Sequence, residues 1–341
     1  MRIECRDDEA AFDALEEAWE ALHERSATAT IFNSVPYARL WWRHFGVPEA
    51  LQLWTVWDNE TLVGVAPLYE TPDERGAPAR RFVGGVEVSD YLDVVAEPGW
   101  EAAVVAALLE RWADAPCRCP LDLRAIRDAS PTREAFLRLA PEWGFFVAVE
   151  QEAVCPVIVL PGSWEAYLEG LDRKLRHELR RKLRKAGQEA LVSMHHVPAA
   201  LVAEEMEDFF RLHALSSPEK AAFMTPTMRA FFRDLAVTFS QRGWLDLVYL
   251  SVDGVRAATH LNFRFRDEVQ LYNGGHDSSI REGLSPGWLL LCYCIEEAIA
   301  EGQKRFDFLQ GDEDYKFRFG ARAEAVWHLT LNVQRANGND G

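Results

Sequence analysis

Apolar residues in this chain occur only in short runs, which limits what the chain can fold into. The longest runs, at 102–109 and 288–295, are eight residues each, whereas a helix that crosses a bilayer needs about 20. Elsewhere, short runs typical of strands alternate with segments of helical periodicity. With 341 residues, 48% of them hydrophobic, the chain can bury a large core, and its length predicts about two domains. We therefore predict an α/β protein with no membrane span.

The amino-terminal sequence and the cysteines indicate a location and a redox state. The start, MRIECRDDEA, has acidic residues where a secretory signal would have a basic and then an apolar stretch, so we expect a cytoplasmic chain. The six cysteines are scattered, and neither C-x-C pair has a second pair or a histidine at zinc-ligand spacing. We expect reduced thiols and no metal. The adjacent His195 and His196 also lack partners at metal spacing.

The two halves of the chain show a similar succession of elements. In the first half, Asp58-Asn59 indicates a hairpin and a second strand pair is expected at 81–95. The remaining first-half elements are helices at 10–23, 37–45, 101–113 and 132–139 and strands at 121–126, 145–149 and 154–160. The second half has expected helices at 203–214, 227–241 and 286–301 and strands at 245–252, 255–265, 269–273 and 305–309. We therefore predict domains at 1–155 and 156–334, with a flexible tail at 335–341.

One long basic helix is expected at 163–186, between an N-cap at Ser163 and a stop at Gly187. Leucines at helical spacing give it a buried stripe. Its segment 173–185 holds eight Lys or Arg and one Glu, a net charge of +7 in a chain of −17, which leaves −24 on the rest. Four arginines share one face beside the leucines: Arg173, Arg176, Arg180 and Arg184.

These arginines need an anion, because like charges at i, i+4 spacing repel by a few tenths of a kcal/mol per pair. The acidic remainder of the protein could supply it, or the stripe could be a solvated face. Alternatively the stripe binds a phosphorylated or polyanionic ligand, since the planar guanidinium pairs bidentately with phosphate. On that hypothesis Arg176 and Arg180 bind substrate. The acidic charge of the whole chain argues against a general nucleic-acid binder.

A strand-loop-helix segment offers a candidate phosphate site. The strand ends at Asn273-Gly274-Gly275, and Ser285-Pro286-Gly287 opens an apolar helix. A helix N-terminus favours pyrophosphate, and glycines at a strand end permit a bulge whose N–H could stabilise an oxyanion. An ordinary turn would use similar residues. The candidate cofactor-binding residues are Asn273, Gly274, Arg281, Gly283, Ser285 and Gly287.

Polar residues crowd the segment after the strand at 305–309, where open α/β sheets bind ligands. Tyr315 could give a proton to a leaving thiolate, and Lys316 could hold a substrate anion or a developing oxyanion. With Asp312 they form the candidate catalytic set, although the acids and Lys316 could simply pair in a turn. In the first half, segment 84–93 contributes Asp90 and Tyr91 as candidate substrate-binding residues, or forms only a hairpin.

The ordered combination of these features resembles the CelD-type branch of the GNAT acyltransferase superfamily, which is related to the FemAB-like aminoacyltransferases. In the second half the likeness is carried by the basic helix, the Gly-Gly strand end, Ser285-Pro286-Gly287, Phe306-Asp307-Phe308 and Gly311-Asp312-Glu313-x-Tyr315-Lys316. In the first half it is carried by Phe32-Asn33-Ser34, the strand at 62–67 and Ser89-Asp90-Tyr91-Leu92-Asp93.

This resemblance implies a fold and an activity. The fold would be two tandem GNAT-like domains, each a mixed, mostly antiparallel sheet flanked by helices and splayed around an acyl donor. The activity would be acyl transfer, with acetyl-CoA or another acyl-CoA as co-substrate, to the amine or hydroxyl of a small molecule or glycan precursor held between the domains. The segment 315–320 is similar to the aromatic-Lys-x-x-Phe-Gly segment of FemAB-like enzymes, where the lysine lies at the active site.

One departure from the family pattern leaves alternatives open. The GNAT pyrophosphate loop reads Gln/Arg-x-x-Gly-x-Gly/Ala, and residues 281–287 match it only loosely. FemAB-like relatives use aminoacyl-tRNA, so one alternative is aminoacyl transfer to a cell-wall or polysaccharide precursor, with tRNA as the one nucleic-acid partner. Another is a non-catalytic protein whose basic helix docks an anionic partner.

Overall fold

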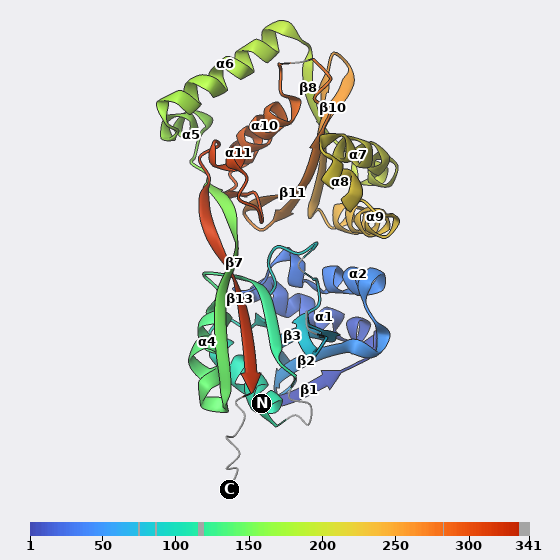
Figure 1. The fold of residues 1–341 in the computed structure, drawn as a ribbon, viewed down its shortest axis with the longest axis vertical. Helices are drawn as coiled ribbons and strands as arrows, with labels where there is room; N and C mark the ends of the chain where they lie inside the picture. The colour runs from blue at the N-terminus through green and yellow to red at the C-terminus, as the bar shows by residue number, and fades with distance from the viewer. Residues whose placement is uncertain (74–75, 86, 115–118, 282, 334–341) are drawn as a thin grey trace. The chain divides into compact units, whose positions relative to one another are not determined.

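The computed structural model (Figure 1) describes residues 1–73, 76–85, 87–114, 119–281 and 283–333; the expected tail at 335–341 lies outside them. The chain forms two compact units. Unit 1 consists of residues 1–153 and the chain from 324 onward, and unit 2 consists of residues 154–323. This division lies two residues before the predicted boundary and differs at the carboxyl end, because the last strand pairs within unit 1 instead of ending the second domain.

Unit 1 is a mixed, mostly antiparallel sheet with helices. Its strands follow the order β1-β2-β3-β4-β6-β13-β7, β5 pairs with β3, and only β4 and β6 are parallel among its recorded pairs. The strands are β1 (Arg2–Arg6), β2 (Leu51–Asp58), β3 (Thr61–Pro72), β4 (Pro78–Phe82), β5 (Val95–Ala96), β6 (Leu121–Arg127), β7 (Phe145–Val159) and β13 (Arg322–Val333). The helices are α1 (Ala10–Arg25), α2 (Val35–Phe45), α3 (Glu101–Ala113) and α4 (Pro131–Leu139), with 3-10 turns at Ile31–Asn33, Pro48–Ala50 and Ala140–Trp143.

Unit 2 is also a mixed sheet flanked by helices, as predicted. Its strand order is β7-β12-β11-β10-β9-β8, in which β11 and β12 are parallel and the other recorded pairs antiparallel. The strands are β8 (Val192–His196), β9 (Leu245–Val252), β10 (Val255–Phe265), β11 (Glu268–His276) and β12 (Arg305–Asp307). The helices are α5 (Trp164–Gly170), α6 (Arg173–Glu189), α7 (Val202–Ser216), α8 (Pro218–Phe223), α9 (Pro226–Gln241), α10 (Pro286–Ala300) and α11 (Asp314–Phe317), with a 3-10 turn at Ala199–Leu201.

The turn between β9 and β10 shows how local sequence sets the sheet of unit 2. Asp253 and Gly254 have φ angles of +51° and +83°, and positive φ at both central residues is what a type I′ hairpin turn requires. Glycine adopts this conformation without a steric cost, and aspartate tolerates it. Strands β9 and β10 therefore pair directly from this turn, with Val255 opposite Val252, before the register shifts between Arg256 and Ala258.

The core of unit 2 lies around α10. This helix is apolar on most sides and packs against β9, β10 and β11 on one side and against α5 on another. Helices α7 and α9 contact these strands as well, through β10, β11 and β9. A helix that is apolar all round must be covered all round, which explains why α5 and α6 form an outer layer over it.

The predicted helix at 163–186 is two helices. The chain leaves the helical conformation at Leu171, and Asp172 then caps α6 by accepting hydrogen bonds from the N–H groups of Lys174 and Leu175 at 2.8 and 2.9 Å. Leu168, Leu171 and Leu179 nevertheless all belong to the buried core. The leucine periodicity continued across the break because both helices cover the same surface.

Two predicted strand boundaries are wrong. The segment 81–95 is not a strand pair in its described residues, 81–85 and 87–95: they contain the end of β4 and the start of β5 (Val95–Ala96) and no other strand. The strands expected at 145–149 and 154–160 are one strand, β7, which passes from unit 1 into unit 2. The strands β1, β8 and β13 and the short helices α8 and α11 have no counterpart among the predicted elements.

Candidate active site

Strands β11 and β12 pair over three positions only. Glu268, Val269 and Gln270 stand beside Arg305, Phe306 and Asp307 in parallel register. Strand β12 then ends, whereas β11 continues to His276, bound on its other edge to β10. Within the described residues, the carboxyl half of β11 therefore has no strand partner on the β12 side. We call this region the fork. It consists of β11 from Leu271 to His276 and of the segment 308–316, which follows β12.

The bulge expected at the fork lies two residues before the first of the glycines. The register between β10 and β11 shifts between Leu261 and Asn262, so Tyr272 is the extra residue of β11. Gly274, the expected oxyanion donor, gives its N–H to the side-chain oxygen of Asn273 at 2.9 Å. Asn273 and Gly274 thus lie together at the fork, but in this state they are bound to each other.

The two glycines serve close packing. A Cβ atom on Gly275 would stand 2.4 Å from the backbone nitrogen of His213 on α7, and one on Gly274 would stand 2.7 Å from the ring of His260 on β10. Neither contact is possible for a real side chain, so only glycine lets α7 and β10 approach β11 this closely.

The amino end of α10 lies beside the end of β11. Ser285 has a φ angle of +55° and makes no side-chain cap hydrogen bond, so the expected serine cap is absent and Ser285 satisfies no first-turn N–H through its side chain. A Cβ on Gly287 would lie 3.1 Å from Nδ1 of His276. The end of β11 therefore brings together three of the predicted cofactor-binding positions. Gly274 lies on β11, and Ser285 and Gly287 lie at the amino end of α10, next to the last residue of β11, His276.

Two lysines of α6 approach this helix end, and sequence reasoning did not select them. Lys185 Nζ donates to the carbonyl oxygen of Gly283 at 3.4 Å, and Lys182 Nζ lies 4.4 Å from the ring centre of Trp288. Arg281, which sequence reasoning did select, is bound to Asp253 at 2.7 Å. The cations nearest to the predicted phosphate loop therefore come from α6.

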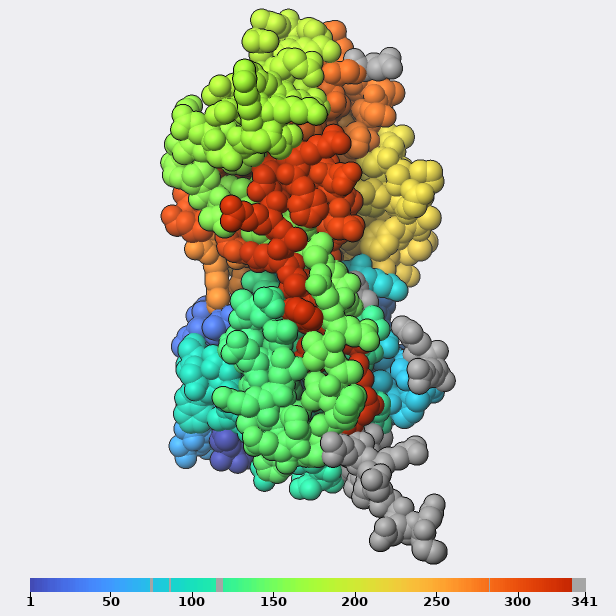
Figure 2. All heavy atoms as spheres, turned by 60° about the vertical axis from the view of Figure 1, so that its left-hand side comes forward, coloured from blue at the N-terminus to red at the C-terminus, as the bar shows by residue number. Residues whose placement is uncertain are grey.

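Most of the cationic side chains of α6 have no ion-pair partner among the described residues. Lys182 and Lys185 pair with Glu178 and Glu189 on the same helix. Figure 2 shows α6, in yellow-green, lying open on the surface of unit 2. Arg176 is half-buried and Arg180 is exposed. Six cations make no recorded ion pair within the described part of the chain: Arg173, Lys174, Arg176, Arg180, Arg181 and Arg184.

The predicted catalytic residues line the chain after β12. Lys316 is only 4% exposed, and its ammonium donates to the carbonyl oxygens of Gln310 and Gly311 at 3.0 and 3.2 Å. It also pairs with the Glu313 carboxylate at 2.8 Å. The three hydrogens of Lys316 Nζ thus have three acceptors, and the lysine fixes the shape of this loop. Asp312 is exposed on the same loop.

Tyr315 stands at the rim of the same loop. Its ring packs edge-on against Phe308, 6.3 Å between centroids. Desolvation of the hydroxyl, with a smaller contribution from the Glu313 carboxylate, raises the pKa of Tyr315. The phenol therefore keeps its proton at neutral pH, which is the state a proton donor needs.

Lys220, on the short helix α8, contacts the fork. Its Nζ donates to the carbonyl oxygen of Gly274 at 2.5 Å. Desolvation lowers the pKa of Lys220; the Glu313 carboxylate opposes this and the Lys316 ammonium adds to it. The side chains of α8 and of the loop after β12 therefore act on each other across the fork.

Three histidines around Lys220 are held neutral. Burial, and then the charge of Lys220, lowers the pKa of His213 to about 4 and that of His260 to about 3. The same two causes lower the pKa of His276. Neutral imidazoles can accept a proton or a hydrogen bond. His213 and His260 are both buried, and each lies against a glycine of the fork.

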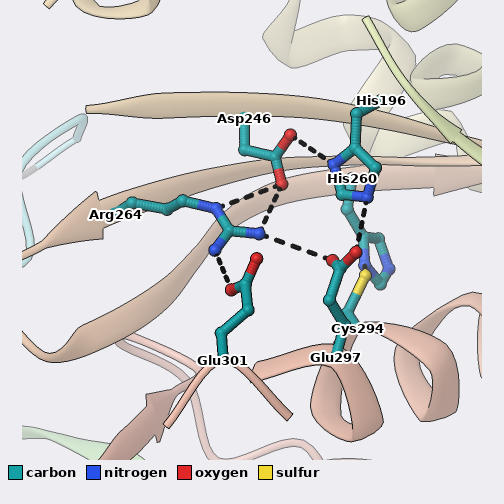
Figure 3. A network of polar contacts seen from close by, with 7 residues as sticks. All are labelled: His196, Asp246, His260, Arg264, Cys294, Glu297 and Glu301. Atoms are coloured by element: carbon teal, nitrogen blue, oxygen red, sulfur yellow. Dashed lines mark hydrogen bonds and ion pairs between the residues drawn. The ribbon is translucent and has the colours of Figure 1, made fainter. Parts of the chain in front are cut away.

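One group of described side chains has donors close enough for a metal ion, and it lies in the network of Figure 3. His196 lies between two carboxylates, with Nδ1 2.7 Å from Asp246 and Nε2 2.9 Å from Glu297. Arg264 bridges the same two carboxylates at 3.1 and 3.4 Å and also binds Glu301. The partners of His196 come from β9 and α10, which sequence spacing did not reveal. Protein cations already compensate these carboxylates.

Asp90 and Tyr91 belong to unit 1. Tyr91 is 3% exposed, and the guanidinium carbon of Arg127 lies 4.0 Å from its ring centre. It lines a small cavity of about 90 Å³ together with Asp93, whose pKa burial raises to about 7. Asp90 is the residue before Tyr91 in the sequence. It is half-buried but does not line the cavity. The other predicted site residues belong to unit 2.

Comparison with known proteins now defines the class. Residues 173–317 match the family model described as acetyltransferase (GNAT) domain. The matched residues lie within unit 2, so this unit contains a GNAT domain. A search of curated proteins finds no match. No helix in the described residues has both the length and the apolar composition to cross a membrane.

Solved structures with the same fold include FemX. That structure is 10% identical, with a TM-score of 0.66 over 96% of this chain and 97% of that one. A conserved protein of unknown function from Bacteroides thetaiotaomicron is 12% identical, with a TM-score of 0.60 over 97% and 100%. L-PGS from Bacillus licheniformis is 10% identical, with a TM-score of 0.53 over 94% and 93%. The likeness to FemX supports the predicted relationship to FemAB-like proteins at the level of the fold.

Proposed function

We propose that this enzyme transfers an acyl group, in the first instance acetyl, from a CoA thioester to the amine or hydroxyl of a small molecule or glycan precursor. The observation that carries the proposal is the fork, where the pairing of β11 with β12 stops after three residues and β11 continues to His276, beside the amino end of α10. An acyl donor laid along the open edge of β11 would place its diphosphate at that helix end. Asn273 and Gly274 would face its thioester.

The residues at the helix end suit a diphosphate. Gly287 has no side chain to block it, Ser285 does not cap the helix, and Lys185 brings an ammonium group to Gly283. Arg281 would contribute only after release from Asp253. We therefore assign the principal charge at this subsite to α6, with Lys182 behind Lys185.

The remaining residues divide the chemistry of acyl transfer. The acceptor attacks the thioester carbonyl, and the C–S bond breaks. Tyr315, kept protonated, gives its proton to the leaving thiolate. Lys316 holds positive charge close to the developing oxyanion, and Asp312, exposed on the same loop, orients the acceptor. Arg176, Arg180, Asp90 and Tyr91 remain proposed substrate contacts.

Binding of CoA tests the donor. CoA should raise the melting temperature of the full chain and bind in calorimetry. Lys185→Ala should weaken that binding roughly tenfold, because a charge-assisted contact contributes about 1.5–3 kcal/mol. Lys304→Ala is the matched control, since this exposed lysine follows the opposite end of α10, about 22 Å away along the helix. A wild-type chain that gives no signal with CoA would refute the proposed donor.

A second candidate function is favoured by the six unpaired cations of α6. They would suit the phosphate backbone of an aminoacyl-tRNA, which would then be the donor for aminoacyl transfer to a cell-wall or polysaccharide precursor. Binding of tRNA should fall steeply with salt. The double substitution Arg180→Glu and Arg184→Glu should lower the slope of log affinity against log salt by roughly 2. An unchanged slope, equal to that of Lys304→Glu, would exclude α6 as a tRNA contact.

A further inference from the structure

Lys220 is the amine at the fork that is best placed to react. The chain has six lysines, all in unit 2. Lys182, Lys185 and Lys316 are bound to carboxylates, at 3.4, 3.7 and 2.8 Å. Lys174 and Lys304 are exposed to solvent. Among these six lysines, Lys220 is the one with a recorded hydrogen bond to β11, which it donates to the carbonyl oxygen of Gly274.

The surroundings of Lys220 lower its pKa, so the amine loses its proton more readily than an exposed lysine. Burial removes water from its ammonium, and the Lys316 ammonium repels it. His213, His260 and His276 face it as neutral bases. The carboxylate that favours the charged form is Glu313, which is engaged by Lys316 at 2.8 Å. Lysines act as nucleophiles where they are desolvated and lie beside another cation.

Lys316 lies across the fork and does not compete. Its three hydrogens donate to Gln310, Gly311 and Glu313, so the Lys316 nitrogen is fully engaged by its own loop. Lys220 has one such bond recorded, to Gly274. Lys220 is therefore the less restrained of the two amines.

We propose that Lys220 is a modification site, which takes the acyl group from a bound acyl thioester when no acceptor occupies the fork. The Nζ lone pair attacks the thioester carbonyl carbon, a C–N bond forms and the C–S bond breaks. The electron pair leaves on sulfur, and the proton lost by nitrogen passes to the thiolate, so the products are Nε-acyl-lysine and free CoA. No oxidant or reductant is needed. The inference rests on the acyl-CoA function proposed above.

Acylation would change the fork. The acyl amide has no charge, so the electrostatic coupling of Lys220 to Glu313 and Lys316 would disappear. The added group would stand beside the Gly274 carbonyl, which Lys220 now contacts. The modified chain should therefore bind acyl-CoA more weakly than the unmodified chain.

The test uses the full chain and acetyl-CoA without an acceptor. After incubation, peptide mass spectrometry should find acetyl-lysine at Lys220, formed several-fold faster than at the exposed Lys174 and Lys304, which report background acylation. In Lys220→Arg the label at this position is lost while the charge and a hydrogen-bond donor remain. Its unfolding transition serves as the check on folding, and Lys304→Arg is the matched control.

The outcomes separate this inference from the function it rests on. Calorimetry with CoA is performed on the same samples. If CoA binds and acetylation is spread evenly over the exposed lysines, Lys220 is not the reactive amine, although the proposed donor stands. If CoA does not bind, the proposed donor and this inference fall together. Label concentrated on Lys220, and absent when CoA is added in excess as a competitor, supports the inference.

Discussion

At the scale of single residues, the protein places charge by pairing groups from distant parts of the chain. His196 on β8 is held between Asp246 on β9 and Glu297 on α10, which lie 50 and 101 residues further along the chain. With both ring nitrogens bound to carboxylates, the imidazole is stabilised in its protonated form. The hydrogen bond that His196 donates to Asp246 is the largest cause of the shift, which raises the pKa of His196 to about 8.

This pairing predicts a pH dependence of stability. The folded-state pKa of His196 lies above its usual 6.5, so the stabilisation is fully present below about pH 6.5 and is lost as the pH rises through 8. The side chain is 37% exposed, so solvent screening limits the effect to at most about 1 kcal/mol. Urea unfolding between pH 6 and 9 should show this loss, and His196→Gln should remove it.

His195 offers the matched control. It is the neighbouring histidine, its ring stacks on Tyr249 with centroids 5.7 Å apart, and burial lowers its pKa. It therefore loses its proton at a lower pH than His196, and His195→Gln should keep the loss of stability that the wild-type chain shows as the pH rises through 8. If both substitutions removed that dependence equally, the ion pairs of His196 would not be its source.

At the residue level, the sequence indicates features whose physical reason is local. The Gly-Gly pair was selected because glycines at a strand end permit a bulge; the bulge lies at Tyr272, and the glycines instead allow close packing, since a Cβ on Gly275 would meet the backbone of His213. Arg281 was selected from its loop, but Asp253, 28 residues earlier, binds it. Pairing between distant elements leaves no trace in local sequence, so the partner of an exposed arginine could not be predicted.

At the scale of elements, long periodic segments were predictable and short ones were not. Helices α7, α9 and α10 have the hydrophobic spacing of a helix over 15 or 16 residues and were expected close to their observed bounds. Helix α8 has six residues and no buried side chain, so it has no such pattern. Lys220 was missed with it, although it lies at the fork.

The break between α5 and α6 has the opposite cause. The leucines kept their spacing across it because both helices pack on the same core. The local signal against a continuous helix was Asp172, whose carboxylate caps the next helix. Aspartate is common at the N-cap position of a helix. Next to a segment with eight basic residues, however, its negative charge can equally be explained as compensation for the positive charges. Periodicity therefore outweighed the capping signal.

At the scale of the whole molecule, the order of the chain and the division into units do not coincide. Strand β13 follows the last element of unit 2 but pairs with β6 in unit 1, from Val326 opposite Arg127 to Leu331 opposite Leu121. Its buried side chains include Val326, Leu329 and Leu331, each no more than 1% exposed. If the sequence is divided once, near residue 155, strand β13 is therefore separated from the unit in which it pairs.

This arrangement predicts the behaviour of fragments. Burying each of those three side chains contributes about 1.5–3 kcal/mol, so losing β13 costs a large share of the roughly 5–15 kcal/mol that stabilises a typical domain. Residues 1–155 alone should therefore not unfold cooperatively in urea when followed by circular dichroism. The same fragment joined by a flexible linker to residues 322–333 should regain a cooperative transition, and Leu329→Asp in the added strand should abolish it. Equal transitions for all three chains would show that unit 1 does not depend on β13. A transition restored by β13 alone would show that the last strand of the chain completes the first unit, because its pairing and apolar side chains match β6.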